Sequence, residues 1–178
     1  MARCFCLAAR KLGTAALLLL AACATTGTQT ALETAPAREP YPSGNPAAPP
    51  DPGQEVLAAG NKLVFADRQM VVGSCWDFVN AVYYAAGYPP DRRQSVFHGR
   101  QKGPYANLRL LRPGDWVMHV NYELGRIGHS GIFVRWLDRR RSLALMLDYV
   151  GMHRRVMGKL SEHNLSRVFA VLRPRETS

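Results

Sequence analysis

The hydrophobic pattern of the chain changes its period near the middle, and this change constrains the fold more than any other feature. Before Gly87 the apolar residues recur at helical spacing, whereas from Leu111 onward short apolar runs are separated by turn residues. We expect a first helix within Glu55–Gln69 and a second that begins at Cys75. Strands should follow in the segments Leu111–Tyr122, Ile127–Leu137, Leu143–Val150 and Arg167–Pro174. Helices followed by such strands predict an α+β fold, with N-terminal helices packed on a small antiparallel sheet.

The second predicted helix has clear boundaries. Ser74 is suited to cap its N-terminus, and Gly87 followed by two prolines is typical of a helix end. The residues at helical spacing on its buried side are Cys75, Phe78, Val79, Val82 and Ala86. The segment from Tyr88 to about Leu108 is rich in Arg, Gln, Gly and Pro, so we expect a loop there that forms one wall of a cleft.

Residues 1–22 have the pattern of a bacterial export signal. Three basic residues precede the apolar run 15–22, which is too short to span a bilayer as a permanent helix. The signal leads into Leu20-Ala21-Ala22-Cys23, which resembles the lipobox of bacterial lipoproteins, where a peptidase cuts before the Cys and its thiol carries diacylglycerol. This resemblance implies lipidation at Cys23 and a membrane anchor. The alternative is a plain signal peptide with an incidental Cys23.

Residues 23–53 should form a lipidated Cys and a disordered tether, because seven prolines fall between positions 36 and 52. About 30 such residues reach roughly 30 Å as a coil and about 90 Å when fully extended. Ala24 stands where enterobacterial lipoproteins retained at the inner membrane have Asp, so the resemblance implies an outer-membrane anchor that faces the periplasm. The folded domain is expected over residues 54–175.

The chain is basic, with a formal net charge of +10 that falls to +7 when the three basic residues of the signal are removed. Its arginine clusters at 92–93, 139–141 and 154–155 are scattered and do not line one helix. For an exported protein, the natural polyanions are phospholipid head groups and wall polymers. We therefore expect envelope partners, no nucleic acid and a monomeric chain.

Cysteine usage points to one residue. Cys4 and Cys6 leave with the signal and Cys23 is lipidated, so Cys75 is left without a partner for an intramolecular disulfide. A lone thiol in an oxidising compartment is a liability unless it is buried or used. At a helix N-terminus the macrodipole also favours the thiolate. Cys75 is thus a candidate nucleophile, and a small buried core residue is the alternative.

A nucleophilic thiol needs a base and a group that orients the base. His129 begins a predicted strand, and Gly131 on the same face would leave room for a helix end to approach. Asp148 lies in an otherwise apolar strand, where an unpaired carboxylate would be costly, so we expect it to hold His129. An Asp at a strand end entering a turn is an equal alternative for this residue.

Other polar residues in this part of the chain could contribute to the site. His119 and Asn121 are alternatives for the orienting role, and His98, His153 and His163 receive no role because their surroundings look polar or loop-like. No Cys-x-x-Cys or His-x-x-x-His spacing occurs, so the sequence predicts neither a metal site nor a cofactor.

The order of these motifs resembles the NlpC/P60 family of papain-like cysteine peptidases. In that family a Cys opens a helix, a Pro-Gly-Asp turn leads into a strand, and a His-x-Gly-Ile-aromatic strand supplies the base. The matching segments here are Gly73–Cys75, Leu111-Arg-Pro-Gly-Asp-Trp116 and Gly128-His-Ser-Gly-Ile-Phe-Val134, with Leu165–Pro174 as the closing strand. The resemblance implies Cys75 as nucleophile, His129 as base and a third polar residue near Asp148.

Members of this family mostly cleave amide bonds in peptidoglycan stem peptides, and many are exported or lipid-anchored. The resemblance therefore implies a cell-envelope cysteine hydrolase. Wall-cutting members usually read Asp-Cys-Ser-Gly at the nucleophile, whereas this chain reads Ser74-Cys75-Trp76-Asp77, and its nearest upstream aromatic is Phe65, where they commonly have Tyr. Two other functions stay open: a catalytically inactive wall-binding lipoprotein, and an acyltransferase or hydrolase acting on lipids.

Overall fold

The computed structural model describes residues 51–123, 125–150 and 157–175. The predicted signal peptide, Cys23, almost all of the tether and His153 lie outside the described residues. Within the described ranges two α-helices, α1 (Pro52–Asn61) and α2 (Cys75–Ala85), precede the strands. None of the helices in this part of the chain is long and apolar enough to cross a bilayer.

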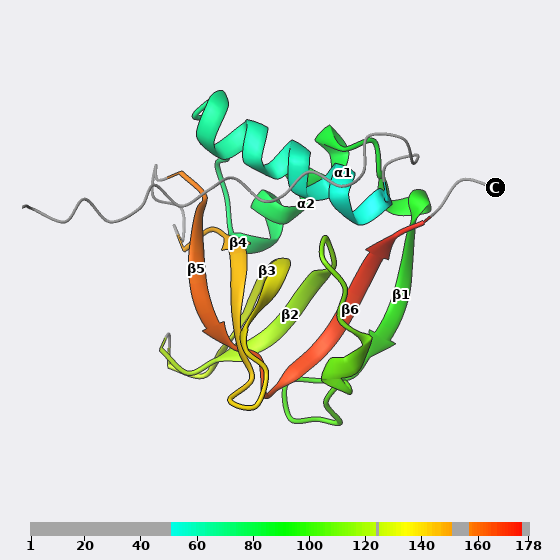
Figure 1. The fold of residues 1–178 in the computed structure, drawn as a ribbon, viewed down its shortest axis with the longest axis vertical. Helices are drawn as coiled ribbons and strands as arrows, with labels where there is room; N and C mark the ends of the chain where they lie inside the picture. The colour runs from blue at the N-terminus through cyan, green and yellow to red at the C-terminus, as the bar shows by residue number, and fades with distance from the viewer. Residues whose placement is uncertain (1–50, 124, 151–156, 176–178) are drawn as a thin grey trace, which may run out of the picture. The chain divides into compact units, whose positions relative to one another are not determined.

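The strands form one antiparallel sheet with the order β1-β6-β2-β3-β4-β5. Their bounds are β1 (Arg93–His98), β2 (Trp116–Asn121), β3 (Ile127–Asp138), β4 (Leu143–Asp148), β5 (Lys159–Asn164) and β6 (Val168–Pro174). Figure 1 shows β1 and β5 at the two edges of this sheet, with the helices gathered at one end of it. The predicted α+β class, with helices on an antiparallel sheet, is confirmed.

Three local expectations were wrong. Strand β1 lies within the segment predicted as a loop, and β5 was not predicted at all. Both are edge strands rich in polar residues, Arg-Gln-Ser-Val-Phe-His and Lys-Leu-Ser-Glu-His-Asn, so neither has the apolar alternation by which a strand is recognised. The first helix also ends earlier than predicted, because α1 passes into a single π-helical turn, η1 (Lys62–Ala66).

The helices pack on one face of the sheet through aromatic and aliphatic side chains. The Tyr83 ring of α2 lies 5.5 Å from the Trp116 ring of β2, and its hydroxyl donates to the Gly114 carbonyl at 2.7 Å. The same hydroxyl accepts from the Trp116 N–H at 2.9 Å. The buried phenol therefore both donates and accepts a hydrogen bond, and α2 is fixed against the start of β2.

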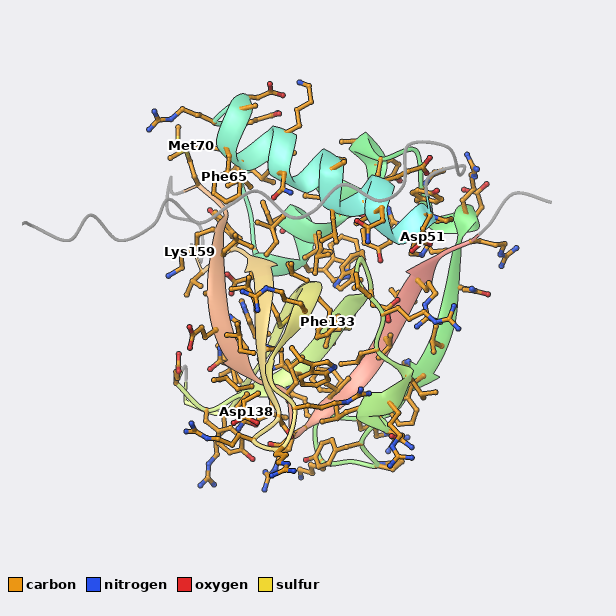
Figure 2. The ribbon with its side chains drawn as sticks, in the orientation of Figure 1. Asp51, Phe65, Met70, Phe133, Asp138 and Lys159 are labelled. Atoms are coloured by element: carbon orange, nitrogen blue, oxygen red, sulfur yellow. The ribbon has the colours of Figure 1, made fainter. Side chains whose placement is uncertain are left out.

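The opposite face of the sheet encloses a second apolar cluster, because side chains alternate between faces along each strand. The buried members of this cluster are Ala106, Leu111, Val117, Phe133, Ala144, Met146, Leu165, Val168 and Val171. Figure 2 shows Phe133 in the middle of the sheet and Asp138 at the end of β3 that lies farthest from the helices. The polar residues of the candidate site share this face, directly beside the apolar cluster.

Candidate active site

Cys75 is the first residue of α2, and a capping box fixes that helix end. The Asp77 carboxylate accepts from the backbone N–H and the hydroxyl of Ser74, at 2.7 and 2.8 Å, while Ser74 Oγ accepts from the Asp77 N–H. Gly73 has φ +136°, and a Cβ there would lie 2.4 Å from the Asp77 carboxylate. Two of the residues around Cys75 that differ from the wall-peptidase pattern, Ser74 and Asp77, thus have a structural role, which is to cap this helix.

The Cys75 thiol is half-buried and lies beside His129 and Ser130 of β3. Burial by itself would raise the pKa of this thiol. The polar groups of His129 and Ser130, together with the positive charge on His129, outweigh burial, so the pKa of Cys75 lies below its ordinary value. The arrangement therefore favours a thiolate at Cys75 beside an imidazolium at His129.

Asp148 holds the other side of the His129 ring. His129 Nε2 lies 2.7 Å from Asp148 Oδ2, and both side chains are buried. Burial would lower the pKa of His129, but the hydrogen bonds with Asp148 and Cys75 and the charges on both raise it to about 9. Because Asp148 occupies Nε2, the ring presents Nδ1 to the thiol. The structure thus brings together the three residues that the sequence singled out.

His163 also belongs to this cluster, which corrects the expectation that it has polar or loop surroundings. It lies on β5, is 5% exposed, and donates from Nε2 to Asp148 Oδ2 at 2.7 Å. Ser161 of the same strand donates to Asp148 Oδ1. Burial would raise the pKa of Asp148, yet these donors and His129 hold it far below its usual range. The alternation Ser-x-His in residues 161–163 was the one available signal, and the polar composition of β5 concealed it.

The alternatives for the orienting role lie nearby but do not hydrogen-bond to His129. The His119 ring of β2 stands edge-on to His129, with centroids 5.6 Å apart. Asn121 places its side-chain amide 3.4 Å from His163 Nδ1, which leaves His163 Nε2 to carry the proton donated to Asp148. His119 and Asn121 therefore surround the cluster, and Asp148 is the group that contacts the His129 ring.

The curvature of the sheet is what brings these strands together. Strands β2 and β5 are separated by β3 and β4, so in a flat sheet they would lie roughly 14 Å apart. The rings of His119 and His163 nevertheless lie 5.1 Å apart. The sheet must curl strongly around this face, and the polar cluster fills one end of the curl.

Gly131 does not make room for a helix end, as was expected. A Cβ at this position would lie 2.9 Å from Met146 Cε and 3.0 Å from Asp148 Cβ, both on β4, and not against the helix. The glycine therefore makes room for Asp148 beside His129.

A Gly131→Val substitution is expected to displace Asp148, because a branched side chain needs more space than Met146 alone yields. We expect the rate of any reaction that depends on Cys75 and His129 to fall by about tenfold or more, in keeping with small misplacements of catalytic groups. Steady-state kinetics measures this, and Gly125→Val, at a glycine with open space around it, is a control for strain at a glycine. Equal losses in the two variants would contradict this function of Gly131.

A pocket of about 320 Å³ opens beside the cluster, on the side of β2 and β5. Its lining consists of His119, Asn121, Tyr122, Glu123, His163, Asn164 and Ser166. The segment Tyr88–Leu108, which was expected to form a cleft wall, supplies none of these residues. The pocket gives the buried imidazoles of His119 and His163 a route to solvent that does not pass Cys75.

Comparisons of the chain with protein-family models, with curated proteins and with solved structures find no match. A thiolate, an imidazolium that can return its proton, and a carboxylate that fixes the ring are the components of covalent acyl transfer. The N–H groups in the first turn of α2 have no intrahelical acceptor, so those of Cys75 and Trp76 are suited to bind an oxyanion.

Proposed function

We propose that the protein is a cysteine hydrolase of NlpC/P60 type that acts in the bacterial cell envelope. The observation that carries the proposal is the continuous chain of contacts from Cys75 through His129 to Asp148. The capping of α2 at Ser74 and the three donors on Asp148 support it, because both hold reacting groups in position.

In the proposed reaction, the Cys75 thiolate attacks the carbonyl carbon of an amide. The negative charge that forms on oxygen is stabilised by the N–H of Cys75 at the helix N-terminus. The His129 imidazolium then gives its proton to the leaving amine, which departs and leaves a thioester on Cys75. Neutral His129 next takes a proton from water, which attacks the thioester and releases the acid. Throughout, Asp148 holds the ring and balances its charge.

The proposed substrate is a peptidoglycan stem peptide. The basic charge of the chain suits an anionic envelope, and the proposed lipid on Cys23 would keep the domain at a membrane beside the wall. Incubation of purified wall fragments with the protein, followed by mass spectrometry, tests the reaction. The expected products are an amine and an acid formed by cleavage of one amide bond. Intact fragments after prolonged incubation would refute a peptidase.

The location is proposed on separate grounds, namely the export signal and lipobox of residues 1–23. Expression in a bacterium fed with labelled palmitate, with and without Cys23→Ala, tests it. We expect label only on the chain that retains Cys23. Label on neither chain, or on both, would reject lipidation at this residue.

A second candidate is a hydrolase or acyltransferase for lipid acyl groups, favoured by exposed apolar residues close to Cys75 in the chain. Trp76 is 49% exposed and Val72 is 83% exposed, and Phe65 and Met70, labelled in Figure 2, are also exposed. Such residues are suited to contact an acyl chain. Trapping of a labelled acyl group as a thioester on Cys75, without cleavage of wall fragments, would favour this candidate over the peptidase.

The reactivity of the thiol gives a test that needs no substrate. Because the pKa of Cys75 is lowered, alkylation by iodoacetamide should reach its maximal rate at a lower pH than for an ordinary thiol, whose pKa is about 8.5. The rate should rise as the pH rises through the lowered pKa, since the thiolate reacts. The mass of the peptide that carries Cys75 gives the rate, with a chelator present to keep trace metal from the thiol.

The same chain unfolded in denaturant is the matched control, because it keeps the thiol and loses the contacts with His129 and Ser130. Identical profiles for folded and unfolded protein would contradict an activated thiol. If the folded chain also bound wall material without cleaving it, a catalytically inactive wall-binding lipoprotein would replace the hydrolase.

A further inference from the structure

Three buried histidines from three different strands meet in the curl of the sheet. His119 lies on β2, His129 on β3 and His163 on β5, and each offers a ring nitrogen within 4.8 Å of the other two. The proposed hydrolysis uses His129, and it uses His163 only through Asp148. It gives no task to His119.

His119 is the residue that needs an explanation. It is 1% exposed, and neither of its ring nitrogens has a hydrogen-bond partner among the described residues. The backbone of Val120 lies near the ring without reaching hydrogen-bond geometry. A buried polar side chain left without a partner is costly and uncommon in native proteins. Such a group in a native protein points to a partner that is a water or an ion.

The ring also has a nitrogen available to a ligand, because His119 is buried and neither of its ring nitrogens has a hydrogen-bond partner among the described residues. Neutral imidazole is a preferred ligand of Zn²⁺ and of related transition metals, and a poor one for Mg²⁺ or Ca²⁺. Metal coordination would give His119 the partner that it lacks.

The spacing of the three rings fits such an ion. Three imidazoles that point at one tetrahedral Zn²⁺, with bonds of about 2.0–2.1 Å, have ring centroids roughly 5 Å apart. The observed centroid distances are 5.6 Å for His119 and His129, 5.1 Å for His119 and His163, and 5.2 Å for His129 and His163. The ring nitrogens, which lie within 4.8 Å of one another, would have to turn towards a common centre to bind one ion.

Asp148 lies close enough to the histidines to serve as a fourth ligand. Its Oδ2 lies 2.7 Å from Nε2 of both His129 and His163, somewhat closer than the roughly 3.3 Å between neighbouring ligands of tetrahedral Zn²⁺. A modest withdrawal of the carboxylate would make it the fourth ligand. The pocket of about 320 Å³ lined by His119 and His163 supplies the entry path for a hydrated ion.

We propose that His119, His129 and His163, with Asp148 as fourth ligand, form a binding site for a divalent transition metal such as Zn²⁺, and that the bound metal switches off Cys75. Coordination replaces the Nε2 protons of His129 and His163, which pass to solvent. The proton on His129 Nδ1, which faces the thiol, stays on the ring, but a metal-bound neutral imidazole gives up this proton far less readily than an imidazolium does and no longer pairs with a thiolate as a free imidazolium. Metal binding stands by itself, whereas the switch rests on the proposed function.

Calorimetric titration of the chelator-treated full chain with Zn²⁺ tests the site, supported by the visible absorption of bound Co²⁺. We expect one buried site per chain, with affinity about tenfold or more lower in His119→Phe. His98→Ala is the matched control, because His98 is an exposed histidine of β1 outside the cluster. Zn²⁺ should also raise the Tm of the wild type and of His98→Ala but not that of His119→Phe.

Folding of the variants is controlled within the same experiment. With chelator present, His119→Phe should unfold at the same temperature as the wild type or higher, because it removes an unpartnered polar group. If that variant does not fold, His163→Asn serves in its place and should lose the metal in the same way. Equal Zn²⁺ affinity in the wild type and in either folded variant would overturn the site.

The rate at which Cys75 is alkylated tests the switch separately from the metal site. Zn²⁺ at saturation should slow alkylation of Cys75 by about tenfold or more in the wild type, whereas it should have little effect in His119→Phe. Zn²⁺ that binds through His119 without slowing alkylation would overturn the switch. Zn²⁺ binding to the Cys75→Ser chain, which does not depend on hydrolysis, would support the site even if wall fragments were never cleaved.

Discussion

Replacement of Cys75 by Ala is expected to abolish hydrolysis of wall fragments, with a fall in kcat of roughly 10⁴-fold or more. The reason is that the thiolate forms the bond to the acyl group, and no other described side chain is placed against His129 to replace it. Product formation measured by mass spectrometry under saturating substrate gives the rate. A Cys75→Ser chain should be nearly as inactive, because His129 is arranged to pair with a thiolate and a hydroxyl ionises far less readily.

The fold should survive both changes at Cys75. The residue is half-buried at the first position of α2, and the helix end is fixed by Ser74 and Asp77, so the free energy of unfolding should change by less than about 1 kcal/mol. Thermal unfolding checks this. Hydrolysis that persists in a folded Cys75→Ala chain would remove the nucleophile from the proposal, whatever the activity of the wild type.

Asp148→Asn is expected to give the second largest effect, a fall in kcat of roughly 10²- to 10⁴-fold. The Asp148 carboxylate accepts from His129 and His163 on one oxygen and from Ser161 on the other. An amide has a single acceptor oxygen, so either both imidazoles or the hydroxyl must lose a partner. If the two imidazoles lose their acceptor oxygen, the His129 ring is no longer held with Nδ1 towards the thiol.

The same substitution should change the acid–base behaviour of the site. The carboxylate is a main cause of the raised pKa of His129, so its loss should lower that pKa from about 9. With less positive charge on His129, the pKa of Cys75 should rise. The alkylation profile of Asp148→Asn should therefore move to higher pH. A profile identical to the wild type would contradict the coupling of these three groups.

Asp115→Asn is the matched control for this experiment. Asp115 is another buried carboxylate, paired with Arg173 at 2.7 Å, and it lies outside the site. Breaking that pair should lower the free energy of unfolding by roughly 1–3 kcal/mol, because the amide leaves the partly exposed Arg173 guanidinium without its charged partner. The alkylation profile of Cys75 should stay in place. A shift of similar size in both variants would indicate a general loss of structure.

Local signals in the sequence were sufficient to predict a helix or strand where the residues that stabilise it lie within a few positions of one another. Ser74, Cys75 and the helix that follows could be predicted, because a cap, a helical stripe and a stop at Gly87 act within a few residues. The four apolar strands β2, β3, β4 and β6 were predicted for the same reason. Strands β1 and β5 escaped prediction because edge strands gain their stability from a neighbour along the backbone and carry no apolar alternation of their own.

The candidate site likewise contains residues that were predicted from the sequence and residues that were not. From the sequence alone, Cys75, His129 and Asp148 were expected to interact. A lone thiol and an unpaired carboxylate in an apolar strand are both unfavourable, and a nucleophilic thiol needs a base. Only the tertiary structure decided that His119 and His163 join them. These residues lie on strands separated by two others, and their meeting depends on how strongly the sheet curls, which is set by packing over its whole length. A property of the whole sheet leaves no local pattern in the chain, and for that reason His163 was assigned no role from the sequence and His119 only an alternative one.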